Sequence, residues 1–174
     1  MSADEDRFAE LYDAHYDRVL RYAARRVDPD TARDVAAETF LVAWRRLSAV
    51  PDEPLPWLIR VAANVLANEN RGRRRDLRLQ ARLGAHHVDA ADHAGAVVGV
   101  DRVRQALEQL SARDRELLQL IGWDELDAAG AAEVLGCSAR TLAVRLHRAR
   151  RRLAKLLEAQ DQSQPVLQIE RGRA

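Results

Sequence analysis

Apolar residues recur at helical spacing through both halves of the chain, and no segment alternates in the manner of a β-strand. A first helix is predicted to run to Val27, on a stripe made by Phe8, Leu11, Tyr12, His15, Val19 and Tyr22. Asp28 and Pro29 predict a stop and a new start, because aspartate suits an N-cap and proline suits the first helical turn. This pattern predicts an all-α fold.

Two more helices are expected in the first half of the chain. The second carries Val35, Phe40, Leu41, Trp44 and Leu47. Pro51, Pro54 and Pro56 then predict a stiff loop and a new helix start. The third helix is expected to run from about Trp57 into a basic cluster, through Ile59, Ala62, Ala63 and Leu66.

The helical pattern weakens from about Leu77 to Val100, which we interpret as a linker because it is polar and rich in small residues. A second bundle is predicted to begin near Asp101, where Ser111 is expected to cap a helix with Asp114 three residues on. The sequence thus predicts two small helical domains, at residues 1–76 and 101–158. A linker at 77–100 joins them, and a flexible tail follows at 159–174.

The segment Asp127–Leu153 predicts two helices around a three-residue turn. Ala132 allows a close approach of the helices, Gly136 can adopt the left-handed conformation, and Leu142 packs the second helix onto the first. A buried stripe is expected at Leu142, Leu146, Ala149 and Leu153. Five arginines are left facing outward: Arg140, Arg145, Arg148, Arg151 and Arg152. Such a helix can enter a major groove and contact phosphates on both sides, which indicates DNA binding.

The distribution of charged residues along the chain is more informative than the net charge. The formal net charge is only +1. Residues 134–157 nevertheless carry basic side chains and no acid, and a second basic cluster lies at 71–75. Acidic residues gather at 4–6, 28–38 and 124–127. Segregation of this kind predicts separate faces for DNA and for another partner.

Several classes of site are not supported. Cys137 is the only cysteine, which excludes an internal disulfide and a cysteine-built zinc site, and it is interpreted as a small packed residue. His86, His87 and His93 stand in the linker without cysteines, so no metal site is predicted. The acidic start argues against a signal peptide, and no apolar run spans a membrane. We expect a cytoplasmic protein without membrane insertion.

In this order and spacing, four segments resemble the extracytoplasmic-function (ECF) sigma factors, the small sigma subunits of bacterial RNA polymerase. Phe8–Tyr12 is similar to the opening helix of that family, and Asp34–Trp44 to its polymerase-clamp-binding helix. Pro56–Asn64 with the cluster 71–75 is similar to its promoter-melting segment. Leu110–Leu117 with the helix-turn-helix is similar to its −35-reading domain. The similarity extends from Phe8 to about Leu157, and the central domain of larger sigma factors has no counterpart.

The resemblance implies that the second helix of the helix-turn-helix reads the −35 element. The implied contacts to bases or backbone are Arg140, Thr141, Ala143, Val144, Arg145, His147 and Arg148. Arginine can bind guanine in bidentate fashion, and Val144 could contact a thymine methyl group. Family members usually carry Lys or Arg at the position of Ala143 and Ser at that of Val144. This chain therefore departs from the pattern that sets the −35 sequence.

The resemblance further implies that the −10 element is melted and its bases captured by the loop Pro51–Pro56 and the helix after it. Asn64 would bind a flipped base edge. Phosphates would be held by Arg60, Arg71, Arg73, Arg74 and Arg75. Asp34 and Glu38, one helical turn apart, would contact the polymerase clamp.

The implied partners are core RNA polymerase, through its clamp and flap, promoter DNA and an anti-sigma factor. No cofactor is implied, and the linker would thread through polymerase toward the active-site and RNA-exit region. Because polymerase is the scaffold, we expect a monomer when the protein is free.

Structural explanations compete with several of these roles. Trp44 and Trp57 lie in phase with apolar neighbours, so we predict that both pack in the core rather than stack on bases. From spacing alone, Asp34 and Glu38 form a solvated helix face. Asn64 can be an ordinary exposed residue, and the run Arg71–Arg75 can be a basic helix end favoured by the helix dipole.

Three other functions compete with the sigma-factor interpretation. A free-standing helix-turn-helix regulator would bind DNA but would not need the segments 34–44 and 57–64. A helical enzyme finds no support, since we identify no phosphate loop, metal constellation or nucleophile–base pair, and we predict no catalytic residue. A protein that only sequesters a partner would bind no promoter even with polymerase present.

Overall fold

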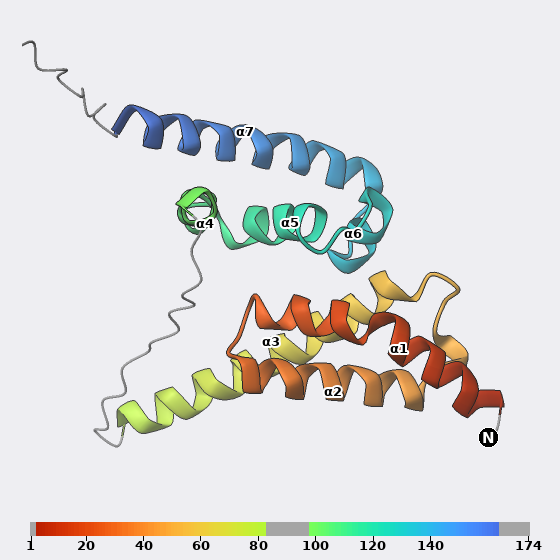
Figure 1. The fold of residues 1–174 in the computed structure, drawn as a ribbon. Helices are drawn as coiled ribbons and strands as arrows, with labels where there is room; N and C mark the ends of the chain where they lie inside the picture. The colour runs from red at the N-terminus through yellow and green to blue at the C-terminus, as the bar shows by residue number, and fades with distance from the viewer. Residues whose placement is uncertain (1–2, 83–97, 164–174) are drawn as a thin grey trace, which may run out of the picture.

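The computed structural model describes residues 3–82 and 98–163, which form two helical layers (Figure 1). Within these ranges there is no strand, so the predicted all-α fold is confirmed. The first layer holds α1 (Ala3–Ala24), α2 (Pro29–Arg45), the 3-10 turn η1 (Leu47–Ala49) and α3 (Pro54–Arg82). The second holds α4 (Val98–Glu108), α5 (Ala112–Gly122), α6 (Ala128–Val134) and α7 (Ala139–Ser163).

The break between α1 and α2 follows the predicted capping chemistry. Asp28 is the N-cap of α2, and its carboxylate accepts hydrogen bonds from the backbone N of Thr31 at 3.0 Å and from Thr31 Oγ1 at 2.8 Å. Pro29 begins the helix, where its missing N–H costs no hydrogen bond. Helix α1 ends at Ala24, three residues before the predicted end, and Val27 is buried in the turn that follows.

The core of the first domain lies where α1, α2 and α3 meet. Its fully buried side chains include Val19, Tyr22, Val35, Leu58 and Ile59. Helix α3 starts at Pro54, earlier than the predicted Trp57, because the loop prolines lie within its first turn. The helix also continues through Arg82, six residues beyond the boundary expected at residue 76. Of the predicted linker, residues 83–97 lie outside the described structure, and they include His86, His87 and His93.

The second domain is built around α5 and α7. Ser111 caps α5 as predicted, since its Oγ accepts a hydrogen bond from the backbone N of Asp114 at 3.2 Å. Leu117 and Leu120 of α5 and Leu142 of α7 are fully buried in the second domain, where α5, α6 and α7 pack against one another. Helix α7 extends to Ser163, past the expected start of the tail at residue 159.

The two domains pack against each other through α3 and α6, and Figure 1 shows α6 on the side of the second layer that faces the first. One cluster of buried apolar residues runs through both domains. It joins Leu58 and Ile59 of α3 to Ala131 and Ala132 of α6. The sequence predicted two domains but not this contact between them.

Candidate nucleic-acid and polymerase interface

The helix-turn-helix is organised by two caps and one glycine. Asp127 is the N-cap of α6, and its Oδ1 accepts a hydrogen bond from the backbone N of Gly130 at 2.7 Å. Gly136 has φ of 61°, the left-handed conformation that a glycine adopts without strain. Ser138 begins the second helix, since its Oγ accepts a hydrogen bond from the backbone N of Thr141 at 3.2 Å. The predicted geometry of the turn is therefore confirmed.

Buried and exposed residues of α7 also lie on different faces of the helix, as predicted. Leu142 and Ala149 are completely buried, and Leu146 and Leu153 are half-buried. The seven residues with an implied −35 role are all exposed on one stretch of the helix: Arg140, Thr141, Ala143, Val144, Arg145, His147 and Arg148. Val144 is 47% exposed, which is unusual for a valine on a packed helix. An exposed face of this composition has the donors and the apolar contacts that major-groove reading requires.

The residues with an implied −10 role lie along the middle of α3. Arg60, Asn64 and Arg71 are exposed, and Arg71 donates a hydrogen bond to Asn68. Arg73, Arg74 and Arg75 continue the same helix. The structure thus places these residues along about four turns of one helix. Arg60 also contacts the second domain, since its Nη1 donates to the backbone O of Glu133 in α6, at 3.4 Å.

The loop before α3 borders a cavity of about 310 Å³ that the sequence did not predict. Pro51, Asp52 and Pro54 line it from the loop, and Arg7 and His15 line it from α1. Arg7 donates to the backbone O of Val50 at 3.2 Å and so holds the loop against α1. Burial and then the charge of Arg18 lower the pKa of His15. No sequence signal joined Arg7 to this loop, because they lie 43 residues apart.

Helix α2 exposes an acidic and aromatic face. Asp34 and Glu38 are both exposed. Leu41 and Trp44 follow at helical spacing and are 40% and 43% exposed. The prediction that Trp44 is a core residue is wrong: its ring packs edge-on against Phe8, with centroids 5.0 Å apart, and leaves one side open to solvent. Trp57, in contrast, is partly buried against the core, as predicted.

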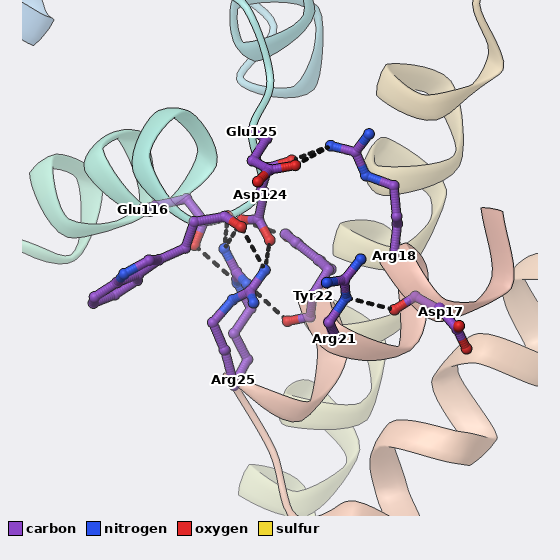
Figure 2. A network of polar contacts seen from close by, with 10 residues as sticks. Asp17, Arg18, Arg21, Tyr22, Arg25, Glu116, Asp124 and Glu125 are labelled. Atoms are coloured by element: carbon purple, nitrogen blue, oxygen red, sulfur yellow. Dashed lines mark hydrogen bonds and ion pairs between the residues drawn. The ribbon is translucent and has the colours of Figure 1, made fainter. Parts of the chain in front are cut away.

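The second domain contacts α1 through a network of charged side chains, which Figure 2 shows from close by. Arg26 pairs with Glu116 and Asp124, and Arg25 also pairs with Asp124. Tyr22 Oη donates to Glu116 Oε1 at 3.1 Å. Burial raises the pKa of the Tyr22 hydroxyl, and the neighbouring carboxylates of Glu116 and Asp124 raise it further. The acidic segment 124–127 therefore faces the chain's own first domain in this structure.

Two further observations concern sites of other kinds. Within residues 3–82 and 98–163, no three His, Cys, Asp or Glu side chains are grouped as metal binding would require. None of the helices described is both long and apolar enough to cross a bilayer. Cys137 is half-buried and packs against the core.

Comparison with known protein families gives two matches, in the order of the two domains. The model for Sigma-70 region 2 matches residues 11–76, and the model for Sigma-70, region 4 matches residues 101–153. The ECF RNA polymerase sigma factor SigL of Mycobacterium tuberculosis is 32% identical over 154 residues, which cover 85% of this chain and 87% of SigL. The RNA polymerase sigma factor CnrH of Cupriavidus metallidurans is 30% identical and covers 91% of this chain and 90% of CnrH.

Two solved structures are similar over both domains. The sigma factor RpoE of Bartonella quintana, in complex with the anti-sigma factor NepR, has a TM-score of 0.67 at 26% identity and covers 87% of this chain and 96% of its own. CnrH in complex with the cytosolic domain of CnrY has a TM-score of 0.61 at 28% identity, with 87% and 88% covered.

Proposed function

This chain belongs to the ECF sigma factors, and we propose that it directs core RNA polymerase to promoters whose −35 and −10 elements it reads with α7 and α3. The observation that carries this proposal is the outward face of α7, which follows a correctly capped turn and lies within the matched region 4. Seven exposed positions share that face, and three of them are arginines. The structure of α7 leaves this face open to a major groove.

The −35 element is read by the first three turns of α7. Arg140, Arg145 and Arg148 supply bidentate donors for guanine or contacts to phosphate, and Val144 supplies an apolar contact for a thymine methyl. Thr141 is already engaged by Ser138, at 2.9 Å between the hydroxyl oxygens. It therefore fixes the start of the helix and presents its methyl group. Ala143 and His147 complete the surface.

The −10 element is captured as single-stranded DNA by the start of α3. Asn64 offers both a donor and an acceptor to a flipped base, and Arg60 and Arg71 lie on exposed positions of the same helix. Arg73, Arg74 and Arg75 extend the positive charge along the helix toward the phosphates of the strand. Arg7 supports this site by holding the loop at Val50.

Core polymerase binds the exposed face of α2. Asp34 and Glu38 supply negative charge, and the adjoining Leu41 and Trp44 supply apolar area beside it. A half-exposed tryptophan next to two carboxylates is a composition that suits a protein interface with a basic partner. Control by an anti-sigma factor is proposed from the two solved relatives, one of which is bound to the anti-sigma factor NepR.

The test is run-off transcription from genomic fragments with core RNA polymerase, in the presence and absence of this protein. Start sites that depend on the protein are expected, and they would reveal both promoter elements together. The double variant D34K/E38K should abolish these transcripts by preventing polymerase binding. The matched control D13K/D17K reverses two exposed carboxylates at the same spacing on α1 and should retain them. Tight duplex binding by the protein alone, without any dependent transcript, would identify a conventional regulator instead.

A further inference from the structure

The second domain has an apolar groove between α4, α5 and α7, with a volume of about 260 Å³. Apolar side chains from all three helices line it: Val103, Leu107, Leu118, Ile121, Trp123 and Leu153. The seven residues proposed to read the −35 element, all of them in the described structure, lie outside this lining. The proposed DNA contacts therefore do not account for the groove.

The lining of the groove is left partly exposed. Trp123 is 40% exposed, and Val103, Leu118 and Ile121 are only half-buried. Concave apolar surface of this kind marks a contact site more often than a bare surface. The volume lies just below the range of about 300–1,000 Å³ that is usual for small-molecule pockets. The groove is thus better suited to a few aliphatic side chains of a peptide segment than to a whole small molecule.

The chain itself carries a segment of this composition just beyond α7. Helix α7 ends at Ser163, and residues 164–174 lie outside the described structure. Pro165 stands two residues after the end of the helix, which it cannot continue. Three aliphatic residues then fall within four positions, Val166, Leu167 and Ile169, and residues 170–174 are polar or small. The apolar side chains that the groove lacks are therefore tethered next to it.

The segment is long enough to reach the groove. From Leu153, which lines the groove, α7 runs ten more residues to Ser163, or roughly 15 Å at about 1.5 Å a residue. A chain that turns back from Ser163 covers up to roughly 13 Å by Leu167 and roughly 20 Å by Ile169, at about 3.3 Å a residue. These lengths bring Leu167 to the near end of the groove and Ile169 into it.

Charge and tethering both favour this occupant. Arg150 lines the groove with an exposed side chain, and Glu170 directly follows Ile169 in the sequence. A segment that places Ile169 in the groove therefore brings a carboxylate toward a guanidinium group. A short tether holds the segment at an effective concentration on the order of 1 mM. A contact that would bind only with a Kd of about 1 mM as a separate peptide is then formed in about half of the molecules.

We propose that Val166, Leu167 and Ile169 dock in the groove between α4, α5 and α7 of the same molecule, with Glu170 beside Arg150. The docked segment shields Trp123 and the apolar lining from water. A protein partner that uses this face of the second domain has to displace the segment first. The proposal depends only on the groove and on the chain's own residues, so its failure would leave the proposed promoter recognition untouched.

Paramagnetic broadening in the full chain tests the docking. A nitroxide is attached at Gly172→Cys in a background with Cys137→Ser, and the methyl signals are followed by nuclear magnetic resonance. The label should broaden the methyl signals of the groove, at Val103, Leu118 and Ile121, and leave those of Leu41 in α2 unchanged. The triple variant V166S/L167S/I169S should lose this selective broadening, because it lacks the apolar side chains that dock. Equal broadening of the groove in the two proteins, or none in either, would overturn the proposal.

Two single variants separate docking from general effects on the tail or the fold. Gln168→Ser changes the same segment without removing an aliphatic side chain, so it should retain the broadening. Gly122 lines the groove, and no atom lies within 4 Å of a Cβ added there. Gly122→Leu should therefore fill the groove without disturbing the helices and should abolish the broadening, with an unchanged circular dichroism spectrum. Loss in Gln168→Ser, or full broadening in Gly122→Leu, would contradict docking in this groove.

A charge exchange and a mixed sample test the direction of the segment and the molecule to which it belongs. Glu170→Arg should weaken the broadening, and the double variant R150E/E170R should restore it. Failure to restore it would overturn the pairing with Arg150. In the mixed sample, nitroxide-labelled chains without isotopes are added to isotope-labelled chains without nitroxide. The groove signals should stay sharp, because each chain fills its own groove. Broadening in that sample would instead assign the groove to a second copy of the chain and overturn docking within one molecule.

Discussion

Helices α3 and α7 both carry proposed DNA contacts, yet they present them differently. The reading face of α7 is exposed along its whole first half, and its packing residues lie on the opposite side. The start of α3, in contrast, also contacts the second domain. Pro56 lies against Gly130 of α6, and Arg60 is hydrogen-bonded to Glu133. One surface therefore lies within a single domain, whereas the start of the other also forms part of the contact between the two domains.

The largest expected effect is on stability. It tests whether the residues of α7 that pack in the core are distinct from those proposed to contact DNA. Leu142→Ala should destabilise the second domain by about 2–5 kcal/mol, because it leaves a cavity at a completely buried position. Val144→Ala, two residues on but 47% exposed, should change stability by less than about 0.5 kcal/mol. Urea unfolding followed by the far-ultraviolet circular dichroism of the helices measures both. Similar losses for the two variants would contradict the division into two faces.

The next effect is on DNA affinity. It tests whether the free protein binds duplex DNA through α7 but not through α3. Arg145→Ala should weaken binding of the free protein to a −35 duplex by about 1–3 kcal/mol, roughly 5- to 150-fold, if it reads a base. Arg60→Ala should leave that affinity unchanged and instead weaken capture of −10 single strands once polymerase is bound. Fluorescence anisotropy with a labelled duplex, taken from a mapped promoter, gives the first value. Equal losses of duplex affinity in both variants would remove the proposed distinction.

A smaller effect concerns the cap that positions α6 over α3. Asp127→Ala removes the hydrogen bond to Gly130 and should cost about 1 kcal/mol of stability in the second domain. It should also lengthen the distance between spin labels placed at Ala37→Cys in α2 and Arg151→Cys in α7, in a Cys137→Ser background, because Gly130 contacts Pro56. Ser138→Ala removes the equivalent hydrogen bond at the start of α7 and leaves Gly130 unchanged, so it should cost a similar free energy without changing the distance. A lengthened distance in Ser138→Ala would mean that the readout is not specific to α6.

The smallest effect concerns His15, beside the loop that precedes α3. Burial, together with the charge of Arg18, lowers its pKa in the folded protein, so the unfolded chain binds the proton first as pH falls below about 6.5. The stability contributed by neutral His15 is therefore complete above that pH and declines below it. Urea midpoints between about pH 5 and pH 7.5 should fall less steeply in His15→Gln than in the unchanged protein. Parallel curves for the two proteins would show that His15 does not contribute.

Features that depend on neighbouring residues could be predicted from the sequence. The caps at Asp28 and Ser111 and the left-handed Gly136 were predicted correctly, since each depends on residues within one turn of the chain. The buried and exposed faces of α7 followed from helical periodicity in the same way. The order of the segments was enough to indicate the sigma family. Helix ends were less accurate, because α3 and α7 continue past their expected limits into sequence that helices tolerate.

Features that depend on packing between distant segments could not be predicted. Periodicity placed Trp44 among core residues, but whether a helix face is covered depends on the element that packs against it, and no element among the described residues covers this side of α2. The pairing of Arg26 with Glu116 and Asp124 joins residues 90 and 98 positions apart. The distribution of charge indicated only that DNA and another partner have separate faces. The sequence by itself thus determined the helices, the turn and the exposed face of α7, through interactions that span a few residues. Only the tertiary structure decided that the acids of the second domain pair with Arg25 and Arg26, in the turn after α1, because that choice depends on how the two apolar cores meet.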